Sequence, residues 1–113
     1  MRIGVPKEVK NHEYRVALTP SGTAALVNMG HEVLVEKDAG LRIGLANSDY
    51  IKAGAKIVAD AASVYAADMV VKVKEPQAQE WPYLREGLVL FSYLHLAAEP
   101  ELTRHLVDGK VIG

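Results

Sequence analysis

The sequence contains no cysteine, which excludes disulfide bonds, thiolate metal ligands and a cysteine nucleophile. Its lysines and arginines are scattered among acidic residues and the formal net charge is only −1, so no basic stripe is available to bind nucleic acid or an anionic membrane. No apolar run is long enough for a membrane span or a secretory signal. We therefore expect a cytoplasmic protein without nucleic-acid or membrane partners.

A glycine-rich nucleotide-binding loop is also missing. No G-x-G-x-x-G pattern follows a strand, and the nearest approach to it, between Gly40 and Gly44, has the wrong spacing. We therefore expect that this domain does not hold a dinucleotide through such a loop.

At 113 residues, the chain is long enough for one domain with a core and too short for two. Hydrophobic residues make up 50% of the chain and charged residues 24%, as in ordinary soluble globular proteins. The composition predicts a single domain over residues 1–113.

Short apolar runs alternate with helical patterns along the chain, which is typical of βαβ units and a parallel sheet. Each run is rich in Val, Ile or Leu, as a strand covered on both faces should be. The predicted strands are residues 2–5, 31–36, 56–58, 69–73 and 88–93. The pattern predicts an α/β fold with three layers, a Rossmann-like parallel sheet with helices on both faces.

Capping residues indicate where the helices begin and end. Thr19 followed by Pro20 predicts the start of a helix, and Gly30 predicts its end. The other predicted helices begin at Asn47 or Ser48 and end near Gly54, run from Asp60 through Ala67, and run from about Pro100 to Val107.

The last residues, 110–113, predict a sixth strand that stops as soon as it has started, whereas a strand usually needs about five or six residues. We therefore expect a truncated domain. The alternative is a chain that exists at this length as a small-carboxylate-binding or interaction module without catalysis, although an unpaired edge would then invite aggregation.

Polar residues that directly follow strands are the candidates for function, because ligands of an open parallel sheet bind outside the carboxyl ends of its strands. Arg15 lies in the segment after the first strand, Lys74 follows the fourth and His95 follows the fifth. If right-handed crossovers place these strands in one sheet, the three side chains can converge on one crevice.

These three side chains have complementary chemistry. Arg15 can hold a carboxylate through two parallel hydrogen bonds. Lys74 can donate a hydrogen bond to a carbonyl oxygen that gains negative charge, or act as an acid or base. His95 can transfer protons near neutral pH.

Other interpretations of Arg15 and Lys74 need no ligand. Arg15 could be a solvated charge or the partner of an acid such as Glu8 or Glu13. Lys74 could form an exposed ion pair with Glu75.

The histidines also allow structural interpretations. His95 could be buried and bonded to the backbone. Tyr93 has the same parity as His95 on an extended segment and could orient it, or it could be an ordinary core tyrosine. His12, His31 and His105 show no metal-ligand spacing, and we interpret them as structural or surface residues, so no metal site is predicted.

A family resemblance is carried by four segments: residues 1–8 (MRIGVPKE), 13–20 (EYRVALTP), 72–76 (KVKEP) and 93–98 (YLHLAA). These segments closely resemble the N-terminus of bacterial alanine dehydrogenases, and the similarity runs through essentially the whole chain. The resemblance implies an N-terminal catalytic and substrate-binding domain.

By motif, the resemblance implies that Arg15, Lys74 and His95 bind pyruvate or L-alanine, with Lys74 and His95 as the catalytic pair. Beside these three, Tyr93 and Glu75 are candidate supporting residues. The implied reaction is oxidative deamination of L-alanine to pyruvate and ammonia. The implied cofactor, NAD, would bind mainly to a second domain absent from this chain, which also supplies an aspartate in family members. The family is usually hexameric, so the resemblance implies a homo-oligomer.

Two related families are alternatives. The NAD-binding subunit of proton-translocating transhydrogenase shares the opening and the R-V-A stretch, but it lacks the counterparts of Lys74 and His95. Saccharopine and lysine–ketoglutarate dehydrogenases keep a similar lysine and histidine but match the surrounding residues less well.

Overall fold

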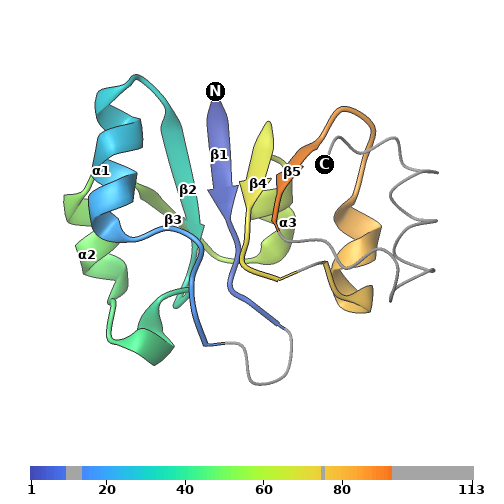
Figure 1. Ribbon diagram of the computed structural model, residues 1–113, viewed down its shortest axis with the longest axis horizontal. Coiled ribbons are helices and arrows are strands. Elements are labelled where there is room, and N and C mark those ends of the chain that lie inside the picture. Colours follow the sequence, from blue (N-terminus) through green and yellow to red (C-terminus); the bar gives the residue numbers. More distant parts are fainter. Residues whose placement is uncertain (10–13, 75, 93–113) are drawn as a thin grey trace.

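Five parallel strands form one sheet in the computed structural model, which describes residues 1–9, 14–74 and 76–92. The strand order is β3-β2-β1-β4-β5, and in Figure 1 the carboxyl ends of the strands lie at the lower edge of the sheet. The strands are β1 (Arg2–Val5), β2 (Glu32–Glu36), β3 (Lys56–Val58), β4 (Met69–Val71) and β5 (Val89–Phe91). The predicted parallel sheet is confirmed.

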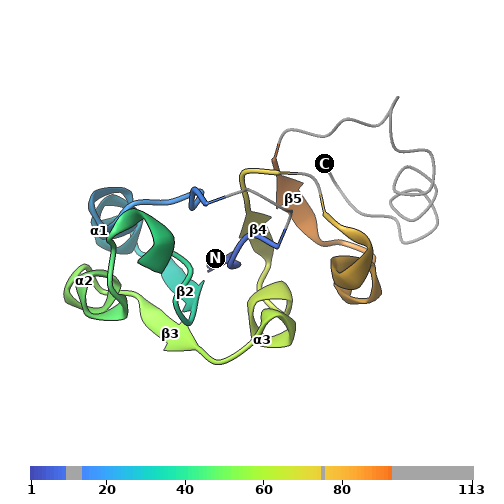
Figure 2. The same ribbon diagram turned by 90° about the horizontal axis from the view of Figure 1, so that it is seen from below.

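Helices cover both faces of this sheet. The helical segments are α1 (Pro20–Asn28), η1 (Leu41–Ile43), α2 (Asn47–Lys52), α3 (Ala61–Tyr65) and η2 (Ala78–Tyr83). Figure 2 shows α1 and α2 on one face and α3 and η2 on the other. The predicted three-layer α/β fold is therefore confirmed.

Each face has its own apolar core. Under α1 and α2 the buried cluster consists of Val5, Val33, Val35, Ala39, Tyr50 and Ala55. Under α3 and η2 it consists of Val64, Tyr65, Val70, Leu88 and Leu90. Successive residues of a strand point to opposite faces of the sheet, and Val33, Leu34 and Val35 of β2 are all buried, so this strand lacks the polar alternation of a half-exposed sheet.

The start of α1 is as predicted. The Thr19 hydroxyl oxygen accepts a hydrogen bond of 3.1 Å from the Gly22 amide, and Pro20 is the first helical residue. Asp60 likewise caps α3 through the Ser63 amide, 2.9 Å away, although α3 ends at Tyr65 and not at Ala67.

The predicted cap of α2 was wrong. Asn47 is the first residue of the helix, and its side chain exchanges two hydrogen bonds with Asp38 in place of capping. The carboxylate of Asp49 accepts from the Ala46 amide at the helix start.

Three predicted strands are too long, and two helical segments were not predicted. The second strand begins at Glu32 and not at His31. The fourth strand ends at Val71 because the Val73 amide donates to the side chain of Glu8 and not to the sheet. The fifth covers Val89–Phe91, which leaves out Leu88 and Ser92. The segments η1 and η2 were not predicted, and the predicted helix near 100–107 and the sixth strand lie outside the described residues.

Candidate functional site

The strand order reverses at β1. The chain leaves β1 for β2 and β3, then crosses back to β4 on the other side of β1. The connections that leave β1 and β4 therefore run to opposite faces of the sheet, and ligands of open parallel sheets bind at such a reversal of strand order. These two connections carry Arg15 and Lys74.

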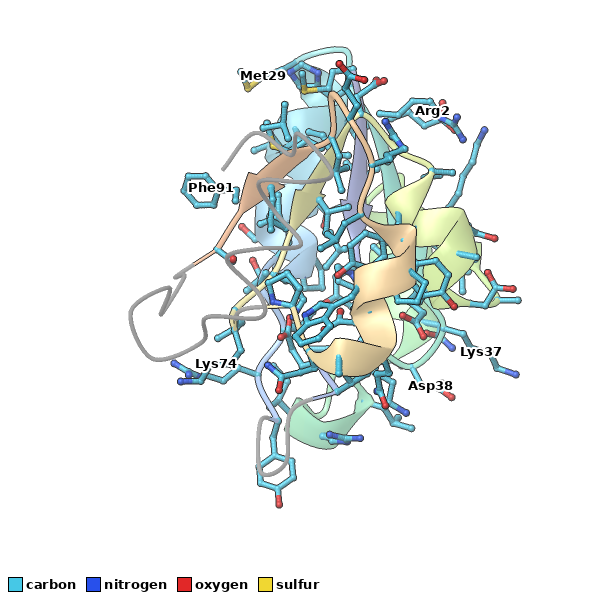
Figure 3. All side chains as sticks on the ribbon, turned by 90° about the vertical axis from the view of Figure 1, so that its right-hand side faces the viewer. Arg2, Met29, Lys37, Asp38, Lys74 and Phe91 are labelled. Carbon is cyan, nitrogen blue, oxygen red and sulfur yellow. The ribbon has the colours of Figure 1, made fainter. Side chains whose placement is uncertain are left out.

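Lys74 lies on the connection from β4 to η2 and is half-buried. Figure 3 shows it at the same end of the molecule as Lys37 and Asp38, which follow β2. Arg2 and Met29 lie at the opposite end. Lys74 is therefore at the carboxyl edge of the sheet, as predicted.

Arg15 lies on the connection from β1 to α1 and is exposed. The ring of its neighbour Tyr14 lies under the guanidinium of Arg42, 5.7 Å from the ring centroid, and Arg42 belongs to η1, which follows β2. Further along, the Leu18 oxygen accepts a 2.8 Å hydrogen bond from the hydroxyl of Tyr50. These contacts hold the connection beside the carboxyl edge.

The other predicted site residues, Glu75, Tyr93 and His95, lie outside the described residues. The convergence of Arg15, Lys74 and His95 on one crevice thus stays a prediction.

A buried ion pair that was not predicted from the sequence contacts the backbone of Lys74. The ammonium of Lys72 is 2.9 Å from Oε1 of Glu8, and both side chains are only 1% exposed. The Glu8 carboxylate also accepts from the amides of Val73, at 3.0 Å, and Lys74, at 3.2 Å. The only sequence signal for this pair is that each charged residue closely follows a buried strand.

Glu80, in η2, is a second carboxylate in this buried cluster. Its Oε1 lies 3.5 Å from the Lys72 ammonium and accepts from the Gln77 amide at 2.9 Å, and its Oε2 accepts from the Tyr65 hydroxyl at 2.7 Å. Burial, and then the Glu80 charge, raise the pKa of Tyr65 well above its ordinary value, so this hydroxyl stays a donor.

Glu36, at the end of β2, anchors the start of the β1–α1 connection. Its Oε1 accepts a 3.0 Å hydrogen bond from the Lys7 amide. Burial raises the pKa of Glu36, partly offset by this hydrogen bond and by the Lys7 charge.

A dinucleotide does not fit the first turn of this sheet. The connection from β1 to α1, residues 6–19, contains no glycine, so it lacks the glycine-rich turn that lets a pyrophosphate approach the backbone. Among residues 1–9, 14–74 and 76–92, no group of three His, Cys, Asp or Glu side chains could hold a metal ion, and no helix could cross a membrane.

Residues 4–113 match the family described as alanine dehydrogenase/PNT, N-terminal domain. The chain belongs to this family. The predicted resemblance is thereby confirmed over almost the whole chain.

Individual members of the family agree with this assignment. The chain is 58% identical over 113 residues to an alanine dehydrogenase of Staphylococcus haemolyticus, and 58% identical over 112 residues to alanine dehydrogenase 2 of Staphylococcus aureus. It covers 30% of the length of each, so it corresponds to less than a third of these relatives.

Two solved structures share the fold. An L-alanine dehydrogenase superposes with a TM-score of 0.96 at 48% identity, over 98% of this chain and 31% of that one. A transhydrogenase from Sinorhizobium meliloti superposes with a TM-score of 0.91 at 30% identity, over 98% of this chain and 32% of that one.

Proposed function

We propose that the chain is the substrate-binding part of an NAD-dependent alanine dehydrogenase, which interconverts L-alanine with pyruvate and ammonia. The observation that carries the proposal is the adjacency of β1 and β4 at the reversal of strand order, since the connections bearing Arg15 and Lys74 leave the sheet side by side there. The 58% identity to alanine dehydrogenases over the whole chain supports it.

Each proposed residue has a distinct role. The Arg15 guanidinium binds the substrate carboxylate through two hydrogen bonds, which fixes the orientation of the molecule. The Lys74 ammonium donates to the carboxylate or the keto oxygen and stabilises negative charge there. His95 polarises the reacting carbon or moves a proton to or from it; the division of acid and base roles between Lys74 and His95 is open.

The nicotinamide dinucleotide would be held by residues outside this chain, because the first turn of this sheet does not fit it. A homo-oligomer in the cytoplasm is part of the same proposal.

The experiment is steady-state kinetics on the full-length protein with pyruvate, ammonia and NADH. Arg15→Ala should raise the KM for pyruvate about 10- to 100-fold, because a charge-assisted hydrogen bond contributes roughly 1.5 to 3 kcal/mol. Arg2→Ala is the matched control, since Arg2 is an exposed arginine at the opposite edge of the sheet (Figure 3). Equal KM values in the two variants would remove Arg15 from the site.

The same assay tests a second candidate. The 30% identity and 0.91 TM-score with a transhydrogenase favour a role in transhydrogenation. A full-length protein of that kind would show no turnover that depends on pyruvate and ammonia. The higher identity to alanine dehydrogenases favours the first proposal.

A further inference from the structure

Both main-chain polar groups of Lys74 are bound by one buried ion pair. The Lys74 amide donates to Oε1 of Glu8 at 3.2 Å, and the Lys74 oxygen accepts from the Lys72 ammonium at 2.9 Å. The Lys72 ammonium is also 2.9 Å from the same Oε1 of Glu8, so the two paired side chains together bind the amide and the carbonyl oxygen of Lys74.

This pair also joins the two connections that leave β1 and β4. Glu8 follows β1 and Lys72 follows β4, 64 residues later in the chain. Their contact fixes the separation of the two connections directly at the reversal of strand order.

Stability alone is a poor reason for such a pair. Removing two charges from water costs several kcal/mol per ion, and replacing a buried ion pair with apolar residues of similar volume is often neutral or stabilising. The feature that apolar residues could not reproduce is the set of hydrogen bonds to the Val73 and Lys74 backbone.

We propose that Glu8 and Lys72 are positioning residues. They fix the backbone of Lys74 and so determine where its ammonium lies relative to the substrate. The proposal rests on the proposed function of Lys74. Neither side chain contacts substrate in this account, because both are almost completely buried.

Glu8→Gln is the most informative single variant. The Lys72 ammonium keeps a counter-charge, because Glu80 lies 3.5 Å away and is itself held by Tyr65 and Gln77. The variant is therefore expected to fold. Three donors converge on the two oxygens of Glu8, however, and a glutamine amide turns an N–H toward at least one of them.

The companion variants separate positioning from stability. Lys72→Met keeps most of the side-chain volume but leaves the carboxylates of Glu8 and Glu80 without the ammonium that both contact. It should therefore be the least stable of these variants. The double variant Glu8→Gln/Lys72→Met removes both charges of the pair and should recover part of the thermal stability. Tyr65→Phe is the matched control, because it loses a buried hydrogen bond of the same cluster that does not touch Lys74.

The readouts are kcat and the KM values for pyruvate and NADH in the full-length protein, together with the melting temperature. Glu8→Gln and the double variant should each lose about 100-fold in kcat/KM for pyruvate, the size of effect expected when a group is displaced by about 1 Å. Their KM for NADH should be unchanged. Tyr65→Phe should melt earlier with its kinetics intact.

Two results would overturn the positioning role. One is wild-type kcat/KM for pyruvate in Glu8→Gln. The other is recovery of activity in the double variant in step with its melting temperature, which would make the pair purely structural. Failure of the proposed function is distinguishable, because the unmodified full-length protein would then show no turnover of pyruvate, and the positioning role in that reaction would fall with it.

Discussion

The hydroxyl of Tyr50 donates a 2.8 Å hydrogen bond to the main-chain oxygen of Leu18, from the layer of helices to the connection that carries Arg15. Tyr50 is completely buried. Burial, and the nearby charge of Asp49, raise the pKa of this hydroxyl, which keeps it protonated and able to donate. The Tyr50 hydroxyl therefore attaches the second half of the β1–α1 connection to α2 from within an apolar core.

Tyr50→Phe should lower the free energy of unfolding by about 1 kcal/mol, because it deletes this buried hydrogen bond and leaves the ring in place. Urea denaturation of the full-length protein measures the loss. The KM for pyruvate should rise less than in Arg15→Ala, since Arg15 itself is retained. Tyr83→Phe, in η2 on the other face of the sheet, is the control, and an equal stability for the two variants would contradict the role assigned to the Tyr50 hydroxyl.

Gly4→Ala should be strongly destabilising. A Cβ at this position would lie 2.4 Å from the main-chain oxygen of Val64 and 2.8 Å from its Cγ1, so α3 would have to move off the sheet. Overpacking of this kind typically costs about 1 to 3 kcal/mol, and the upper end is expected because one of the atoms is backbone.

The control for Gly4→Ala is Gly30→Ala. Gly30 has a φ of 93° but open space around it, so only the backbone strain of roughly 1 kcal/mol applies. If thermal melts show Gly4→Ala to be the milder of the two, α3 does not pack on β1 as described.

Glu36→Gln should give a stability gain that depends on pH. The pKa of Glu36 is raised in the fold mainly by burial, so the charged form is disfavoured there relative to the unfolded chain. The protonated Glu36 carboxyl contributes its whole stabilisation below its pKa in the unfolded chain, about pH 4. This contribution is lost as the pH rises through the pKa in the folded protein. A glutamine can still accept from the Lys7 amide and carries no charge.

Melting temperatures of wild type and Glu36→Gln between pH 3.5 and 8 test this. The variant should melt slightly higher near neutral pH, and the two should converge below about pH 4. A variant that melts lower than wild type near neutral pH and converges with it below about pH 4 would show that the charge of Glu36 supports the fold, and would contradict the prediction.

The sheet could be predicted because its strands are continuous apolar runs, and Thr19, Pro20 and Asp60 act within a few residues of themselves along the chain. The errors arose where a backbone group forms its hydrogen bond with a residue that is distant in the sequence. The predicted fourth strand continued to Val73 because valine fits the apolar pattern, but its amide binds Glu8, 65 residues away in sequence. No local pattern reports such a contact.

The same limit explains what was found and missed at the site. The position of Lys74 at the carboxyl edge followed from strand order, which hydrophobic pattern and crossover handedness constrain. The burial of Lys72 could not be predicted, because lysine is almost never buried unless paired and its partners come from the other connection and from η2. Composition cannot show such a pairing.

The central claim is that the residues at the carboxyl ends of β1 and β4 bind and activate a small keto acid through Lys74. The measurement that tests it most directly is kcat/KM for pyruvate in full-length Lys74→Ala and Lys37→Ala, two lysines at the same end of the molecule (Figure 3). The account predicts a loss of about 100- to 1000-fold for Lys74→Ala, the effect typical of removing one donor to a developing oxyanion, and little change for Lys37→Ala. Comparable activity in the two variants would contradict it.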